Sequence, residues 1–262
     1  MRIRAWLVVA LAIAFVATAC GGGGDSTLGK RVDPSASAVT TVPRVTQSAA
    51  VPAGYSQTAN VKRALTSLAV YPSPTAGTPS MTLPNPWVVD KRFPDQTVQQ
   101  VFLVKSLRND GWVEVQLPVR PNGTTGWIRV NDVDLVANPF RITVELGAHR
   151  ITVAELTKVL YQGTVAVGAA ETPTPLGSYF IRVLVQAPDP TTVYGPYAYG
   201  LSSHSDALEE FNGGDAEIGI HGNDDASVLG SNVTHGCVRM DNDAITALSR
   251  QLPLGTPVDI VA

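Results

Sequence analysis

Short runs that alternate apolar and polar residues, broken by glycine and proline turns, constrain the fold of this chain most. The run WVEVQL at residues 112–117 alternates in this way, and the turn sequences NDG (109–111) and PNGTTG (121–126) flank it. A period of two residues is typical of a half-buried strand, and turns this close together favour antiparallel hairpins. With 23 glycines and 19 prolines in 262 residues, the pattern predicts a mainly β fold with many turns.

The N-terminus has the features of a secretory signal. Arg2 and Arg4 precede the apolar run 5–16, and the small residues ATAC end at Cys20. The apolar run is shorter than the ~20 residues that a membrane-spanning helix needs. We therefore expect residues 1–19 to be a signal peptide and the protein to be exported.

The cysteine at the predicted cleavage site resembles the lipobox of bacterial lipoproteins. It is followed by GGGGDS, although Ala17 stands where that motif usually has leucine. The resemblance implies that Cys20 becomes the lipidated first residue of the mature chain. The protein would then lie on the outer face of the cytoplasmic membrane, facing the cell wall, with a lipid anchor. The alternative is a plain signal peptide cleaved near Ala19, without a lipid.

Composition divides the rest of the chain into three parts. Residues 20–60 are rich in Gly, Ser, Thr, Ala and Pro without sustained periodicity, which predicts a flexible tether. Residues 61–137 contain short β-type runs whose cadence, GWVEVQLP followed by GTTGWIRVNDV, resembles bacterial SH3-like domains. This resemblance implies a small β-barrel, in which Trp112 and Trp127 pack in the core or at the rim, or alternatively bound a binding groove.

Residues 138–262 are again predicted to be β-rich, with one helix. Apolar runs such as FRITVEL (140–146), GSYFIRVLVQ (177–186) and EIGIHG (217–222) are separated by Gly- and Pro-rich connectors. The segment DNDAITALSRQL at 241–252 has apolar residues at helical spacing, and Asp241 is a suitable N-cap. We expect a short helix soon after Cys237.

Charge and residue counts exclude several functions. The formal net charge of −3 gives no basis for a nucleic-acid partner. Four histidines and two cysteines without metal-type clustering predict no metal site, and the acidic stretch NDDAS (223–227) is interpreted as a solvated turn. His149 and His204 have no evident partner and are expected at the surface.

The segment NVTHGCVRMD at 232–241 holds the chemically active candidate. If Cys20 is lipidated, Cys237 is the only remaining thiol of an exported protein, and it cannot form an internal disulfide. It is either a buried inert residue or a nucleophile for acyl transfer, for which a histidine must accept its proton. His221 and His235 are both candidate bases, and the spacing alone does not choose between them.

The residues around Cys237 resemble the signature of the L,D-transpeptidase catalytic domain of the YkuD type. The resemblance consists of IHG at 220–222 followed by THGCVRMDNDA at 234–244, supported by VGAAETPTPLGSYFI (167–181) and YGPYAYGLSSHS (194–205). It covers roughly residues 138–262 and implies a β-sandwich catalytic domain. It also implies Cys237 as nucleophile and His221 as general base.

The same resemblance assigns the neighbouring positions. The carbonyl of Gly222 would orient the base, and the amides of Gly236 and Cys237 would form an oxyanion hole. The expected pocket residues are Thr234, His235, Arg239 and one or both of Tyr197 and Tyr199. Two alternatives stay open: His235 as a core histidine, and Arg239 in a solvated ion pair with Asp241 or Asp243.

The implied reaction is cross-linking of peptidoglycan stem peptides (3→3 type) through a cysteine thioester, without a cofactor. Carbapenem-type β-lactams would acylate the same thiol. Two other functions are considered: an L,D-carboxypeptidase that transfers the same thioester to water, and a non-catalytic wall-binding lipoprotein. The intact cysteine motif argues against the last.

Overall fold

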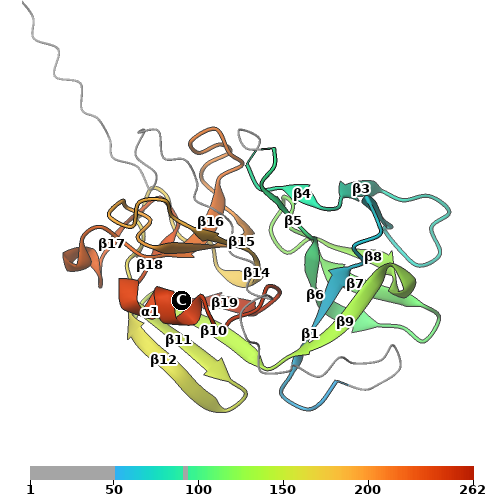
Figure 1. Cartoon of the computed structure of the whole chain (residues 1–262), viewed down its shortest axis with the longest axis horizontal. Helices are drawn as coiled ribbons and strands as arrows, with labels where there is room; N and C mark the ends of the chain where they lie inside the picture. The colour runs from blue at the N-terminus through green and yellow to red at the C-terminus, as the bar shows by residue number, and fades with distance from the viewer. Residues whose placement is uncertain (1–50, 91–93) are drawn as a thin grey trace, which may run out of the picture.

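A computed structural model describes residues 51–90 and 94–262, which form two β-rich modules (Figure 1). The predicted signal peptide, Cys20 and most of the predicted tether lie outside these residues. Within them the one α-helix is α1 (Asn242–Leu248), and the remaining elements are strands and short 3₁₀ turns. The prediction of a mainly β fold is confirmed.

The N-terminal module is built around a five-stranded sheet with strand order β8-β7-β6-β1-β9. Its strands are β1 (Ser56–Val61), β6 (Val101–Leu107), β7 (Trp112–Gln116), β8 (Thr125–Arg129) and β9 (Val133–Asn138). Two small sheets pair β2 (Ser67–Val70) with β3 (Met81–Pro84) and β4 (Trp87–Val88) with β5 (Thr97–Val98). Regular structure thus begins at Ser56, earlier than the boundary predicted at residue 60, because β1 pairs along its whole length with β9.

The C-terminal module contains an eight-stranded sheet with order β12-β11-β10-β19-β14-β15-β16-β18. The strands are β10 (Phe140–Glu145), β11 (Arg150–Glu155), β12 (Lys158–Thr164), β14 (Gly177–Gln186), β15 (Tyr197–His204), β16 (Glu217–His221), β18 (Val238–Arg239) and β19 (Pro257–Val261). A separate parallel pair joins β13 (Val167–Gly168) to β17 (Asn232–Thr234).

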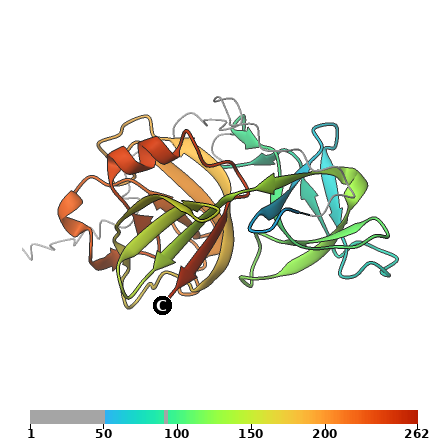
Figure 2. The same cartoon turned by 90° about the horizontal axis from the view of Figure 1, so that it is seen from below.

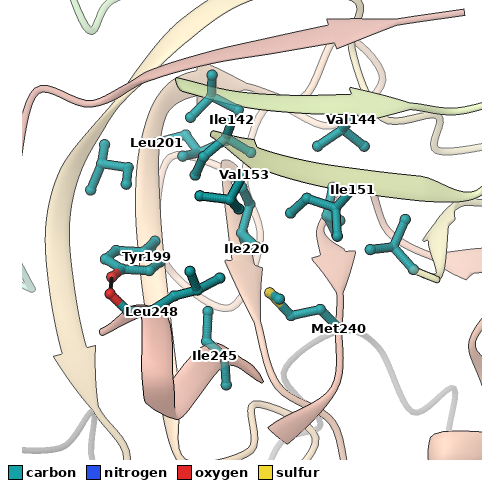
Figure 3. Close-up of a cluster of buried hydrophobic side chains, with 14 of the residues drawn as sticks. Ile142, Val144, Ile151, Val153, Tyr199, Leu201, Ile220, Met240, Ile245 and Leu248 are labelled. Atoms are coloured by element: carbon teal, nitrogen blue, oxygen red, sulfur yellow. Dashed lines mark hydrogen bonds between the residues drawn. The ribbon is translucent and has the colours of Figure 1, made fainter. Parts of the chain in front are cut away.

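The core of the C-terminal module follows from strand alternation. Ile142 and Val144 of β10 lie opposite Val153 and Ile151 of β11, and all four are buried. Figure 3 shows how these side chains gather with those of β15, β16 and α1 in one cluster. Side chains at alternate positions point to the same face, so the strands that carry the candidate site are fixed from one side by this core.

The predicted helix is present but shorter than the expected segment 241–252. The side chain of Asp241 accepts a hydrogen bond from Ala244 N–H at 2.9 Å, which makes it the N-cap. The helix ends at Leu248, and a turn places Leu252, fully buried, in the core. Helical spacing therefore correctly predicted that Ala244, Leu248 and Leu252 are buried, although Leu252 lies after the helix has ended.

The two modules lie side by side, as Figure 2 shows from below, and apolar side chains pack between them. Phe180 of β14 is fully buried in the hydrophobic cluster of the N-terminal module. Trp87 and Val98 form a second cluster with Val183 and Val185 of β14. These two apolar clusters join the N-terminal module to β14.

The tryptophans of the N-terminal module lie in aromatic and cationic contacts. Trp112 is 4% exposed, lies edge-on to Tyr71 and is covered by the guanidinium of Arg129, 3.6 Å from its ring centroid. Trp127 is half-buried beneath Arg108, 5.9 Å from the ring centroid. These contacts favour the packing interpretation of Trp112. The likeness of the module to SH3 domains stays a prediction.

Candidate active site

Strand pairing brings the two sequence motifs together. β16 and β18 are adjacent and parallel, and Ile220 pairs with Val238 while His221 pairs with Arg239. Ile218, Ile220, Val238 and Met240 all lie in the core cluster, on one face of these strands. Their neighbours in sequence therefore turn to the opposite face.

His221 is the last residue of β16, and Cys237 directly precedes the neighbouring strand β18. Cys237 precedes β18 by one residue, so continuing the pairing places it opposite Gly219, two residues before His221. Adjacent strands lie about 4.8 Å apart, and Gly219 has no side chain to fill the space beside the thiol. A Cβ atom at Gly219 would lie 4.0 Å from Cδ2 of His221. Cys237 is half-buried and forms no disulfide bond.

The imidazole of His221 is held in one orientation. Its Nδ1 lies 2.8 Å from the carbonyl oxygen of Gly222, and the side chain is 1% exposed. A carbonyl oxygen only accepts hydrogen bonds, so Nδ1 must carry the proton and donate it. In the neutral ring, Nε2 then has the lone pair that a general base requires.

Helix α1 holds the turn that carries this carbonyl. The side chain of Asn242 bonds both polar main-chain groups of Asn223, and the Nδ2 of Asn223 donates to the carbonyl of Met240 at 2.7 Å. Gly195 and Gly222 pack closely against each other beside Asn242. A Cβ atom on Gly222 would lie 2.1 Å from Asn242 Oδ1 and 3.0 Å from Gly195 Cα, so this position has no room for a side chain. The sequence interpretation missed Asn242, although it lies in the quoted DNDA segment.

An aromatic ring packs against the imidazole. The ring centroid of Tyr194 lies 5.1 Å from that of His221, and the rings are tilted by 59°. Gly195, with φ of +62°, turns the chain directly after this tyrosine. The prediction named Tyr197 and Tyr199 instead, although Tyr194 opens the YGPYAYG segment that suggested them.

Tyr199 is a core residue, which corrects its predicted place in the pocket. It is 1% exposed, and its hydroxyl donates a hydrogen bond to the carbonyl of Leu248 at 2.8 Å (Figure 3). Its burial raises the pKa of the phenol. Tyr197 is half-buried, packs against the same core, and its carbonyl accepts the N–H of Gly222 at 3.2 Å. Tyr197 thus contributes, through its main chain, to the turn that holds the imidazole of His221.

The turn before the thiol is closed by Thr234. Its Oγ1 donates to the carbonyl of Cys237 at 2.5 Å and accepts the N–H of Gly236 at 3.2 Å. Gly236 has φ of +111°, and its carbonyl accepts the hydroxyl of Thr174 at 2.9 Å. The N–H of Gly236 is therefore occupied within the turn, which does not fit the oxyanion contact predicted for it. Thr234 is fully buried and shapes this turn.

His235 and Arg239 flank the thiol in sequence and differ in burial. His235 is half-buried and its ring packs against Phe211, with 5.5 Å between centroids and an angle of 31°. Arg239 is 8% exposed, so it is not the solvated ion pair considered as an alternative, and its Nε is buried without a hydrogen-bond partner. It lies opposite His221 in the pairing.

His204 corrects another expectation, because it is 1% exposed and not a surface residue. Its Nε2 lies 3.2 Å from a carboxylate oxygen of Asp215.

Residues 51–90 and 94–262 contain no group of three or more His, Cys, Asp or Glu side chains arranged to hold a metal ion. The same residues include no helix with the length and apolarity needed to span a membrane.

Comparison with known proteins finds similarity in the C-terminal module. Residues 139–260 match the family model of the L,D-transpeptidase catalytic domain, YkuD. Two curated relatives carry the L,D-transpeptidase YkuD name: one from Bacillus subtilis, 30% identical over 122 residues, and one from Bacillus licheniformis, 31% identical over 122 residues. Each match covers 47% of this chain and 66% of the relative, so the chain spans just under two thirds of their length.

The solved structures similar to this chain include two from mycobacteria. One is an L,D-transpeptidase from Mycobacterium smegmatis, 15% identical, covering 63% of this chain and 90% of its own, with a TM-score of 0.39. The other is L,D-transpeptidase 3 from Mycobacterium tuberculosis in complex with a faropenem-derived adduct, 14% identical, covering 55% and 76%, with a TM-score of 0.39.

Proposed function

We propose, on the premise that residues 139–260 form an L,D-transpeptidase catalytic domain of the YkuD family, that this chain cross-links peptidoglycan stem peptides through Cys237. The single observation that carries the mechanism is the pairing of β16 with β18, from which His221 and Cys237 share one face. The hydrogen bond from His221 Nδ1 to the Gly222 carbonyl supports His221 as the base.

The first half-reaction forms a thioester. His221 Nε2 accepts the proton of the Cys237 thiol, and the sulfur attacks the carbonyl carbon of the L-residue in the terminal L–D peptide bond of a donor stem. The C–S bond forms, the C–N bond of the tetrahedral intermediate breaks, and the imidazolium returns its proton to the leaving amine of the D-residue. No metal or organic cofactor takes part in this scheme.

The second half-reaction transfers the acyl group. The amine of a diaminoacid on a neighbouring stem attacks the thioester carbon, loses a proton to His221 and displaces the sulfur of Cys237. The product is a 3→3 cross-link between two stems. Carbapenem-type β-lactams would acylate Cys237 by the same attack on a strained carbonyl, without a leaving amine.

Export and anchoring complete the proposal. Peptidoglycan lies outside the cytoplasmic membrane, so the substrate requires the exported location that the N-terminal sequence predicts. A lipid on Cys20 would hold the catalytic domain near the wall. Replacing Cys20 with Ala should release the protein from membranes, and continued membrane retention of that variant would contradict lipidation.

The decisive experiment incubates the purified protein with a tetrapeptide stem, alone and then with an acceptor stem. A cross-linked dimer that forms only with the acceptor supports the transpeptidase, whereas free tripeptide without dimer shows the carboxypeptidase. Mass spectrometry after a carbapenem should show a covalent adduct that Cys237→Ala lacks and that His221→Ala forms slower by orders of magnitude. An unchanged rate in His221→Ala would transfer the base function to His235.

A further inference from the structure

The loop between β15 and β16, residues 205–216, is a compact unit with a rigid tip. Ser205 N–H donates to the Ala216 carbonyl at 2.9 Å, which closes its base. At the tip, Phe211 and Gly214 exchange two main-chain hydrogen bonds of 3.0 and 2.9 Å. The two residues between them have φ of +51° and +77°, which defines a type I′ turn of the Asn-Gly class. The loop therefore presents the ring of Phe211 in a defined position.

That ring contacts the nucleophile motif. Phe211 packs against His235, two residues before Cys237, with 5.5 Å between ring centroids. The rings are tilted by 31°, and this separation lies within the range at which aromatic rings attract each other. The 205–216 loop thus reaches the segment that carries the thiol.

The other side of the loop is held by the N-terminal module. The loop between β7 and β8, residues 117–124, extends Arg120 toward it, and this guanidinium donates to three main-chain carbonyls. The acceptors are Ser205 O at 2.5 Å, Leu208 O at 2.9 Å and Asp215 O at 3.1 Å. A planar fork with five donors suits several fixed acceptors at once, so one side chain joins both ends of the 205–216 loop.

Asn122 of the same 117–124 loop completes the attachment. Its Oδ1 accepts the His204 N–H at 2.9 Å, and its Nδ2 donates to the His204 carbonyl at 2.7 Å and to Asp206 Oδ1 at 3.1 Å. The side-chain amide thus pairs with both main-chain groups of the last residue of β15. The β15 strand end and the 205–216 loop are both fixed by residues that lie more than 80 positions earlier in the chain.

We propose that Arg120 is a positioning residue of the catalytic site, which acts by holding the 205–216 loop so that Phe211 packs against His235. The N-terminal module is then part of the catalytic unit. The loop would then form one wall beside Cys237, against which a stem peptide binds. This part of the inference rests on the proposed function.

The test measures the Phe211–His235 contact directly in the full chain, without substrate. An aromatic ring at this distance shifts the NMR resonances of the His235 ring, and Phe211→Ala should remove that shift. Arg120→Ala should move the His235 resonances in the same direction and speed hydrogen exchange in residues 205–216 about tenfold. Arg108→Ala is the matched control, because Arg108 pairs with Asp110 on the surface of the same module, and it should change neither measurement.

Arg120→Lys gives a second variant that keeps the charge but cannot reach all three carbonyls, and it should give intermediate values. His235 resonances and loop exchange that stay at their wild-type values in both folded Arg120 variants would overturn the proposal. This holds whether or not the protein proves to be a transpeptidase, because neither measurement requires turnover.

The consequence for catalysis is measured as acylation of Cys237 by a carbapenem. In Arg120→Ala the second-order rate should fall about tenfold through weaker binding, while the limiting rate of acylation stays unchanged. In the Phe211→Ala background the Arg120 change should add little, because both act through one contact. If the losses in acylation rate from the two single changes add up in the double variant, Arg120 does not act through Phe211. A wild type that is never acylated would contradict the proposed function alone.

Discussion

The side chain of Asn242, in the first turn of α1, forms two hydrogen bonds with the main chain of Asn223. Its Oδ1 accepts the N–H of Asn223 and its Nδ2 donates to the carbonyl of Asn223, each at 2.9 Å. Asn223 directly follows Gly222, whose carbonyl orients the imidazole of His221. Helix α1 is thus linked to the imidazole of His221 through two intervening residues.

Replacing Asn242 with Ala should slow acylation of Cys237 while the chain stays folded. Both bonds are lost, which costs about 1–3 kcal/mol of stability for the groups left unsatisfied. The released turn lets the imidazole rotate, so we expect a rate loss of about ten- to a hundredfold. The measurement is carbapenem acylation by mass spectrometry. Asn242→Asp is the control variant. It keeps the acceptor oxygen, so its acylation rate should lie between those of the wild type and Asn242→Ala. Equal rates in all three proteins would exclude a positioning function.

Gly222→Ala should be destabilising, because a Cβ atom there would lie 2.1 Å from Asn242 Oδ1 and 3.0 Å from Gly195 Cα. Relieving contacts this short moves the turn, at a cost of about 1–3 kcal/mol. The measurement is the free energy of unfolding by urea denaturation. Gly77→Ala is the control variant, since a Cβ on Gly77 meets no atom within 4 Å. A Gly222 variant as stable as the Gly77 variant would show that the turn has room the structure does not indicate.

Tyr199→Phe should lower stability without changing acylation. The hydroxyl bonds the carbonyl of Leu248 inside the core, and removing it leaves that carbonyl unsatisfied at a cost of about 1 kcal/mol or somewhat more. Thermal or urea unfolding measures the loss, and carbapenem acylation measures the site. A slower acylation with unchanged stability would return Tyr199 to the pocket from which the structure removes it.

Sequence pattern predicted the mainly β class of fold and singled out a candidate active segment because both depend on local properties. Short β-type runs need only neighbours in sequence, and they correctly indicated β7, β10, β14 and β16. Strand β15 was not indicated, because its segment was interpreted as a loop beside the substrate. The HGC segment stood out because it holds a thiol beside a histidine and a glycine, and the functions expected of its residues came from the family resemblance. Asp241 could be identified as an N-cap for the same local reason.

Contacts between distant residues were beyond such reasoning. Tyr199 and Tyr194 are both tyrosines of one short segment, and only the pairing of β15 with β14 and β16 decides that the first enters the core. His204 looked like a surface residue, yet Asn122 and Asp215 enclose it from two other parts of the chain. The occupied N–H of Gly236 depends on a turn closed by Thr234, which spacing does not reveal.

His204 should make the folded state sensitive to mildly acidic pH. Burial lowers the pKa of its imidazole from the ordinary 6.5, against the opposing effect of the Glu217 and Asp215 carboxylates. Below about pH 6.5 the unfolded chain therefore takes up a proton that the folded chain resists, so stability at neutral pH is lost as the pH falls toward the lowered folded pKa. Each unit of depression corresponds to about 1.4 kcal/mol. Urea denaturation at about pH 7.5 and about pH 5.5 should show a larger loss for the wild type than for His204→Gln, which cannot titrate in this range. Equal losses in the two proteins would mean that His204 takes up its proton as readily folded as unfolded.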